Sequence, residues 1–284
     1  MKTKSLVFLS ASFLFFTRQA SSTTVNTCAR YQAVTVGSYI VQTDYWHQDL
    51  CPGIQCMSID DQTGSYTVTK GTYSCDFNVA SYPSILYGRA FGSNSPNSAL
   101  PASVSLLKCV NTDWSFKPTN SGRWDAAYDI WLCPDNQCGP GGFNGGLELM
   151  IWLDYLNTNG WKNDLGPVTV DGMNWELWEC DGDSGADNHR YVAYLAKKPT
   201  TSIKNLDIKG FLDDSQDRGY IKPSWYLYAV EVGNEIASGG IPFTSNSFSV
   251  SVNKNCGAKP IFTPLPFTPT PTPDLTPDVI PPPP

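Results

Sequence analysis

The sequence predicts an all-β protein, a jelly-roll β-sandwich of two antiparallel sheets with one short helix. Many short segments alternate apolar and polar residues with period two, which is the pattern of half-buried strands. Clusters of Gly, Asn, Asp and Pro separate these segments at short intervals and indicate turns. A parallel α/β sheet would need many crossover helices, and one segment alone has helical spacing.

The predicted elements follow from this alternation. The clearest strands are residues 65–69, 124–132, 147–153, 175–178, 191–195, 225–235 and 247–252. The helical candidate is Ser202 to Leu212, because apolar residues there fall roughly along one face of a helix. One helix among so many strands favours the sandwich.

The two ends of the chain differ from its middle. Lys2 and Lys4 precede an apolar stretch at residues 6–16, and small residues follow, so residues 1–22 are predicted to be a signal peptide of a secreted, extracellular protein. A retained membrane anchor is the alternative, but the stretch is short for a bilayer. Eleven of the 22 prolines lie between 260 and 284, so residues 258–284 are predicted to be a disordered Pro/Thr-rich tail. One domain remains, residues 24–257.

The nine cysteines agree with an extracellular location, where disulfides persist. Cys133 and Cys138 could close a small loop, and Cys28 could pair with Cys51 or Cys56. The odd count leaves one thiol free or intermolecular. With two histidines and no close pair of Cys-x-x-Cys units, a zinc site is not expected. We expect no metal and no cofactor.

Charge and composition narrow the class of partner. The net charge of −7 and the pI near 4.8 argue against nucleic acid, which requires a basic surface. Charged residues make up 16% of the chain and aromatic residues 13%, so rings are available to stack on a neutral surface. An uncharged polysaccharide suits this composition. We expect a monomer with no membrane partner.

The strand at residues 147–153 carries the most informative residue. Its even-numbered face holds Glu148 together with Met150 and Trp152, whereas the other face is entirely Leu and Ile. A carboxylate on a strand face otherwise suited to packing must be solvated, paired or used in chemistry. Glu148 next to an indole favours sugar chemistry.

Two further strands carry acids on one face. Asp129 shares its face with Asp125 and Trp131, and Glu231 shares its face with Glu235. Each acid alone is more often a solvated surface residue, but several acids on aromatic-lined strands fit glycoside cleavage. A retaining glycosidase needs a carboxylate nucleophile and a carboxylic acid donor, with carboxyl groups about 5–5.5 Å apart. Adjacent antiparallel strands hold side chains at about that separation.

The run Glu148-Leu149-Met150-Ile151-Trp152-Leu153 resembles the nucleophile strand of family-12 glycoside hydrolases, which are small jelly-roll endoglucanases and xyloglucanases. Other segments resemble the same family in the same order along the chain, and together they cover most of residues 28–253. These segments are residues 44–46, 127–130, 165–167, 230–235 and 246–250.

The resemblance implies roles for three acids. Glu148 would be the nucleophile, Glu235 the acid/base, and Asp129 the residue that hydrogen-bonds the nucleophile. Glu231 is the rival to Glu235 because it shares its face. The implied activity is that of a secreted, endo-acting β-1,4-glucanase that hydrolyses cellulose, xyloglucan or mixed-linkage β-glucan by a retaining double displacement. Its partner would be the β-1,4-glucan itself.

The resemblance also implies residues that bind the substrate. Trp46 would stack on a glucosyl ring, and Met150 and Trp152 would line the site. The departures from the family pattern include two of these candidate positions. Asp44 stands where the family often has Asn, and Tyr31 stands where an early Trp is usual. These departures concern substrate preference more than the reaction.

Two other functions are considered. A non-catalytic relative could hold glycan without cutting it, although the chain keeps both Glu148 and Glu235. A trypsin-like serine protease is suggested by the segment 180–185, Cys-Asp-Gly-Asp-Ser-Gly. However, His47 lacks the sequence context of the protease histidine, and Ala186 and Asp187 follow the segment in place of Gly-Pro. An acidic hairpin loop is the simpler interpretation.

Overall fold

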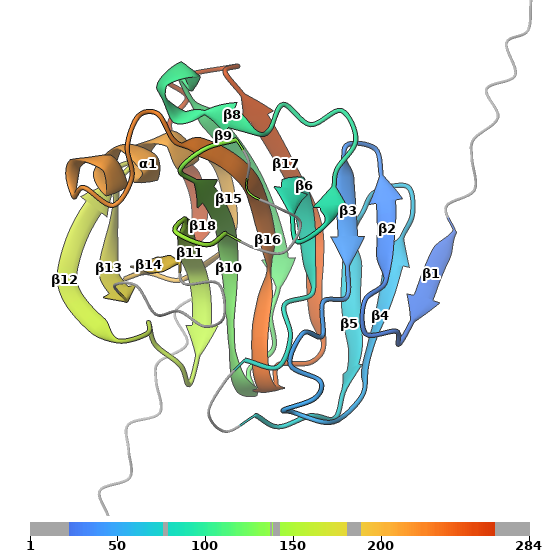
Figure 1. Cartoon of the computed structure of the whole chain (residues 1–284). Coiled ribbons are helices and arrows are strands. Elements are labelled where there is room, and N and C mark those ends of the chain that lie inside the picture. The colour runs from blue at the N-terminus through green and yellow to red at the C-terminus, as the bar shows by residue number, and fades with distance from the viewer. Residues whose placement is uncertain (1–22, 76–78, 137, 139–142, 181–188, 265–284) are drawn as a thin grey trace, which may run out of the picture.

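The computed structural model describes residues 23–264 except 76–78, 137, 139–142 and 181–188. Within this part of the chain the strands form a seven-stranded and an eleven-stranded sheet (Figure 1). The seven-stranded sheet has the order β1 (Thr24–Thr27), β4 (Gln55–Asp60), β5 (Tyr66–Gly71), β17 (Phe243–Val252), β9 (Val110–Lys117), β15 (Thr200–Asp207) and β18 (Ile261–Pro264). The prediction of a two-sheet β-protein is confirmed.

The eleven-stranded sheet carries the acids singled out above. Its main path runs β12 (Asn163–Val170), β13 (Met173–Cys180), β14 (Arg190–Ala196), β11 (Leu147–Leu156), β10 (Gly122–Cys133), β16 (Tyr226–Gly239), β6 (Ser84–Ala90), β3 (Tyr39–Gln42) and β2 (Ala33–Val36). Two short strands lie off this path: β7 (Ser93–Asn94) pairs with β6, and β8 (Ala102–Ser103) pairs with β16, next to the 3₁₀ turn Val104–Leu106. Figure 1 shows β11, β10 and β16 running side by side through the middle of the molecule.

One strand pair departs from the predicted antiparallel sheets. Strands β11 and β14 are parallel, with Glu148 opposite Tyr191. The cause is the path of the chain, which leaves β11, forms the antiparallel pair β12 and β13, and returns beside β11 in its original direction. This arrangement places the beginning of β14 beside the beginning of β11.

The core lies between the sheets and follows the predicted strand faces. The odd-numbered residues of β11, from Leu147 to Leu153, are fully buried in the main apolar cluster, together with Tyr128 of β10. Met150 and Trp152 belong instead to a second, smaller cluster on the opposite face of the sheet. The period-two alternation therefore predicted correctly which of these side chains face the main core and which lie on the opposite face of the sheet.

The predicted helix at Ser202–Leu212 is wrong in its first half. Residues Thr200–Asp207 form strand β15, which pairs with β9, and the helix α1 spans Ile208–Asp217. The Asp207 carboxylate accepts a hydrogen bond from the Lys209 N–H (3.0 Å) and so caps the helix at its true start. Pairing with β9 overrides the helical spacing of the preceding residues, and Phe211 anchors the helix edge-on to Trp175.

The predicted tail from residue 258 also needs a correction at its start. Residues Ile261–Pro264 form strand β18, which extends the seven-stranded sheet by pairing with β15. The Thr200 hydroxyl donates to the Thr263 carbonyl (2.7 Å) and helps to hold this strand. Residues 265–284 and 1–22 lie outside the described part of the chain.

Four disulfides link the described cysteines. The pairs are Cys28–Cys56, Cys51–Cys75, Cys109–Cys256 and Cys133–Cys138. The small loop at 133–138 is therefore confirmed, and Cys28 takes the second of its two predicted partners. The remaining thiol, Cys180, is buried at the end of β13. Among the described residues, no helix is long and apolar enough to cross a membrane.

Candidate active site

Strand β10 is the centre of the candidate site, and β11 and β16 flank it. Three neighbouring strands contribute five carboxylic acids on the sheet face that turns away from the main core: Asp125 and Asp129 on β10, Glu148 on β11, and Glu231 and Glu235 on β16. Register places Glu148 opposite Trp131. Because alternate residues of a strand share a face, the sequence itself gathers these acids once the three strands pair.

Glu235 and Asp125 form a cross-strand pair. They are direct register partners, and their side chains are hydrogen-bonded. Burial raises the pKa of Glu235 to about 7, the bond with Asp125 opposes this rise, and the charge of Glu148 adds to it. Burial, together with the charge of Glu235, also raises the pKa of Asp125. Glu235 can therefore hold a proton near neutral pH, as a general acid must.

Glu148 is half-buried and interacts with His189, a residue that no sequence pattern indicated. Its Oε2 lies 2.8 Å from Nε2 of His189, and the two side chains are 17% and 7% exposed. His189 immediately precedes β14, the strand that runs parallel to β11. The only available signal was that His189 is one of two histidines in the chain. Its position beside Glu148 depends on a strand pairing that local pattern does not reveal.

Asp129 lies in the site but does not have the predicted partner. Its Oδ2 accepts a hydrogen bond from Nε1 of Trp131 (3.1 Å), and Oδ1 has no hydrogen-bond partner among the described residues. The expectation that Asp129 hydrogen-bonds Glu148 is therefore not met. Burial raises the pKa of Asp129, and the charges of Glu148, Glu231 and Glu235 raise it further. The Asp129 carboxyl is thus electrostatically linked to the acids on both flanking strands.

Glu231 is held inside the structure. It is 2% exposed, and its Oε2 accepts hydrogen bonds from Nε2 of Gln42 and Oγ of Ser84, both at 3.0 Å. Burial raises the pKa of Glu231 to about 8, and the charge of Asp44 adds to this rise, whereas the two hydrogen bonds oppose it. Glu231 is buried and anchored, so it is placed less well than Glu235 to meet a substrate.

The residues expected to bind sugar fall into two groups. Met150 and Trp152 face the site side of the sheet but are buried, at 1% and 3% exposure, with the Trp152 indole N–H directed at the Met150 sulfur (3.4 Å). They form a floor beneath the site and not an open platform. Trp46, by contrast, is 40% exposed in the loop after β3 and can present a ring to a ligand.

Arg30 organises the loop that carries Trp46. Its guanidinium donates to the Trp46 carbonyl (2.7 Å) and lies over the ring of Tyr31, which is 63% exposed. Asp44 in the same loop has a backbone φ of 33°, a left-handed conformation that Asn and Asp adopt more readily than most residues. Burial raises the pKa of Asp44 to about 7 against the opposing charge of Arg30. Tyr31 is thus next to this loop, and Asp44 connects the loop electrostatically to Glu231.

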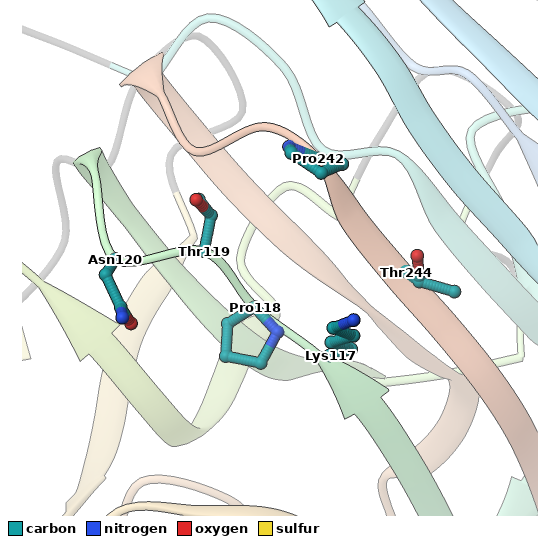
Figure 2. Close-up of a pocket in the computed structure, with 6 residues that line it drawn as sticks. All are labelled: Lys117, Pro118, Thr119, Asn120, Pro242 and Thr244. Atoms are coloured by element: carbon teal, nitrogen blue, oxygen red, sulfur yellow. The ribbon is translucent and has the colours of Figure 1, made fainter.

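A surface hollow elsewhere does not compete with this site. Figure 2 shows its lining, which comes from the end of β9 with the turn after it and from the beginning of β17 with the residue before it: Lys117, Pro118, Thr119, Asn120, Pro242 and Thr244. None of these lining residues is an acid, so the hollow has no group for general acid catalysis. Across the described residues, no group of three or more His, Cys, Asp or Glu side chains is arranged to hold a metal ion.

The protease alternative gains no support. Most of its motif, from residue 181 onward, lies outside the described residues. His47 is occupied elsewhere, with Nδ1 at 2.6 Å from the Val79 carbonyl and its ring against Trp46.

Comparison with known proteins agrees with the site. The model of glycosyl hydrolase family 12 matches residues 37–253. A probable cellulase, Cel12b, from Mycobacterium tuberculosis is 32% identical over 54% of this chain and 97% of its own length. The xyloglucan-specific endo-beta-1,4-glucanase A from Emericella nidulans is 27% identical over 80% of this chain and 90% of its own.

Solved structures extend the agreement to three dimensions. Endoglucanase cel12A from Rhodothermus marinus superimposes with a TM-score of 0.75 at 40% identity and covers 80% of this chain and 98% of its own. The predicted jelly-roll fold is therefore confirmed, as is the resemblance of the chain to family 12. The chain belongs to glycosyl hydrolase family 12 and is a glycoside hydrolase.

Proposed function

We propose that this glycoside hydrolase is an endo-acting β-1,4-glucanase that works by a retaining double displacement. The observation that carries the proposal is the pair formed by Glu148 and Glu235, on the two strands that flank β10. Glu235 has a raised pKa near neutrality, to which the charge of Glu148 contributes. A protonated acid beside a second carboxylate is the pair of groups that glycoside cleavage requires.

The steps follow from these roles. Glu148 attacks the anomeric carbon and forms a C–O bond, while Glu235 gives its proton to the departing glycosidic oxygen. Glu235, now ionised, removes a proton from water as that water attacks the anomeric carbon. The bond to Glu148 breaks, and both acids return to their initial states. Asp125 influences the pKa of Glu235 through its hydrogen bond, and Asp129 influences the pKa of Asp125 through its charge.

The substrate class is supported by the relatives and by the site. The names of two relatives, a probable cellulase and a xyloglucan-specific endo-beta-1,4-glucanase, both refer to β-1,4-linked glucose chains. The partly exposed Trp46 offers a platform for a neutral glucosyl ring. Cellulose, xyloglucan and mixed-linkage β-glucan share this backbone, so we propose the class and leave the preference among them to assay.

We also propose that the protein is secreted and acts as a monomer. The N-terminal segment has the charge and apolar pattern of a signal peptide, and four disulfides fit an oxidising compartment. Size-exclusion chromatography and N-terminal sequencing of the exported protein test these two proposals.

One experiment tests both substrate class and mechanism. The purified protein is incubated with a panel of β-1,4-linked glucans, and the anomers of the first products are followed by NMR, with Glu148→Gln as the control. We expect mid-chain cleavage and β-anomers before mutarotation. Initial α-anomers would contradict the retaining mechanism. Binding of glucan without product in the parent protein would instead identify a non-catalytic glycan-binding relative.

A further inference from the structure

The hydrogen bond between His189 and Glu148 has a direction that chemistry fixes. A nucleophilic carboxylate is ionised and can only accept hydrogen bonds. Nε2 of His189 must therefore carry a hydrogen and donate it to Oε2 of Glu148 across 2.8 Å. In the described part of the chain this is the one hydrogen bond that the Glu148 side chain makes. The orientation of the nucleophile thus depends on His189.

The fold holds His189 in place from two sides. The adjacent Arg190 N–H donates to the Gly146 carbonyl (3.0 Å), which ties the segment before β14 to the segment before β11. The imidazole also lies edge-on to Trp131, with ring centroids 5.1 Å apart at 74°. Trp131 is stacked in turn on Phe143 (4.7 Å, 24°). Because His189 is 6% exposed, its contact with Glu148 is sheltered from water.

Trp131 separates the task of His189 from that of Asp129. Its indole N–H is donated to Asp129, and its ring supports the imidazole of His189. Asp129 is thereby committed to Trp131. Asp129, on the strand between Glu148 and Glu235, therefore interacts with Glu148 through its charge. His189, on the other side of β11, is the residue that hydrogen-bonds Glu148.

We propose that His189 is the residue that positions the nucleophile in this enzyme, a role that rests on the proposed function of Glu148. By holding Oε2, the imidazole directs the other carboxylate oxygen at the anomeric carbon. In the glycosyl-enzyme that other oxygen is bonded to the sugar, and Oε2 is the ester carbonyl. When water displaces Glu148, negative charge returns to the carboxylate and the hydrogen bond from His189 strengthens. His189 therefore favours the second step most, because a bond that strengthens toward the transition state accelerates that step.

The test compares variants on a 2,4-dinitrophenyl β-cellobioside, whose leaving group needs no proton. His189→Ala should slow release of the glycosyl-enzyme by roughly ten- to a hundredfold, the range for losing a hydrogen bond to a charged group. The variant should then show a burst of dinitrophenol followed by a slow steady state, with KM lowered as the intermediate accumulates. His189→Gln keeps an N–H donor and should recover part of the lost rate. Phe91→Leu is the matched control, because Phe91 also lies edge-on to Trp131 (4.9 Å) and is half exposed.

A 2-deoxy-2-fluoro-cellobioside reagent separates failure of this inference from failure of the proposed function. Intact mass and peptide mapping should find the label on Glu148 in the parent enzyme. A label on another residue, or none, would overturn the proposed function, and the role of His189 falls with it. A label on Glu148 that forms and is released at parental rates in both folded His189 variants would overturn the role of His189 alone. If His189→Ala does not fold, His189→Gln is compared with Phe91→Leu, and equal burst and release kinetics in the two would also overturn it.

Discussion

Two Asp–Glu pairs lie four residues apart on the same strands and the same face, yet their surroundings differ. Asp125 faces Glu235, and Asp129 faces Glu231, each across β10 and β16. Glu235 is half-buried and hydrogen-bonded to Asp125, whereas Glu231 is 2% exposed and accepts hydrogen bonds from Gln42 and Ser84.

The difference shows how one strand can carry both a reactive acid and a structural acid. Burial raises both pKa values, that of Glu235 to about 7 and that of Glu231 to about 8. A pKa near neutrality is therefore not sufficient to identify the proton donor. The proton donor must also be accessible to the substrate, and Glu235 is only half-buried whereas Glu231 is 2% exposed.

The largest expected effect comes from removing the charge of Glu148, which contributes to the raised pKa of Glu235. Glu148→Gln keeps the shape of the side chain and removes its charge, so the fold should survive while hydrolysis of β-glucan falls by several orders of magnitude. Reducing-sugar release and the Tm should be measured together on the purified variant. A rate above about a tenth of the parent rate, a barrier change below roughly 1.4 kcal/mol, would remove Glu148 from the nucleophile role.

The next effect tests the two glutamates against each other. Glu235→Ala should reduce hydrolysis of natural glucan by about 10²- to 10⁴-fold, as for loss of a general acid, but spare a dinitrophenyl glycoside much of its first step. Azide should then restore turnover by attacking the glycosyl-enzyme in place of water. Glu231→Ala is the matched control and should show no azide effect. Rescue at Glu231 and none at Glu235 would reverse the assignment.

Sequence pattern predicted the faces of the site but not its contacts. The alternation around Glu148 and Asp129 is fixed along each strand, so local residues were enough to place these acids on one face. His189 was missed because its position depends on the parallel pairing of β14 with β11, which joins segments far apart in the chain. The partner of Asp129 was missed because it depends on how the indole of Trp131 is oriented. The helix start was wrong because pairing with β9 decides where β15 ends.

A smaller effect is expected from a substitution in the loop after β3. This loop contains Asp44, whose charge raises the pKa of Glu231. Trp46 lies two residues later and is 40% exposed. Trp46→Ala should lower kcat/KM for glucans by about ten- to a hundredfold, or ~1.4–2.7 kcal/mol, through lost ring contacts. The Tm should change little, since deletion of a core Trp typically costs about 3–5 kcal/mol of stability. A large fall in Tm with unchanged kinetics in the folded fraction would place Trp46 in the core.

The smallest expected effect is a pH dependence of stability that reflects the raised pKa values of Glu235 and Glu231. An acid whose pKa is raised on folding binds more protons in the folded state than in the unfolded state between its two pKa values. Its contribution to stability is therefore fully present below the unfolded pKa, about 4.3 for Glu, and is lost as pH rises through the folded pKa. Because the folded values are about 7 for Glu235 and about 8 for Glu231, the Tm should decline as pH rises from about 5 to 8.

Glu231→Gln should make that decline shallower, because the amide does not titrate. The same variant should keep the alkaline limb of kcat/KM near pH 7, since catalysis needs Glu235 and not Glu231 to be protonated. Asp44 and Asp129 also have raised pKa values and face this region, so part of the slope will remain. Thermal melts and kcat/KM are measured in parallel across pH 5–9. If Glu231→Gln abolished the alkaline limb and left the slope of Tm intact, Glu231 would be the reactive acid and Glu235 the structural one.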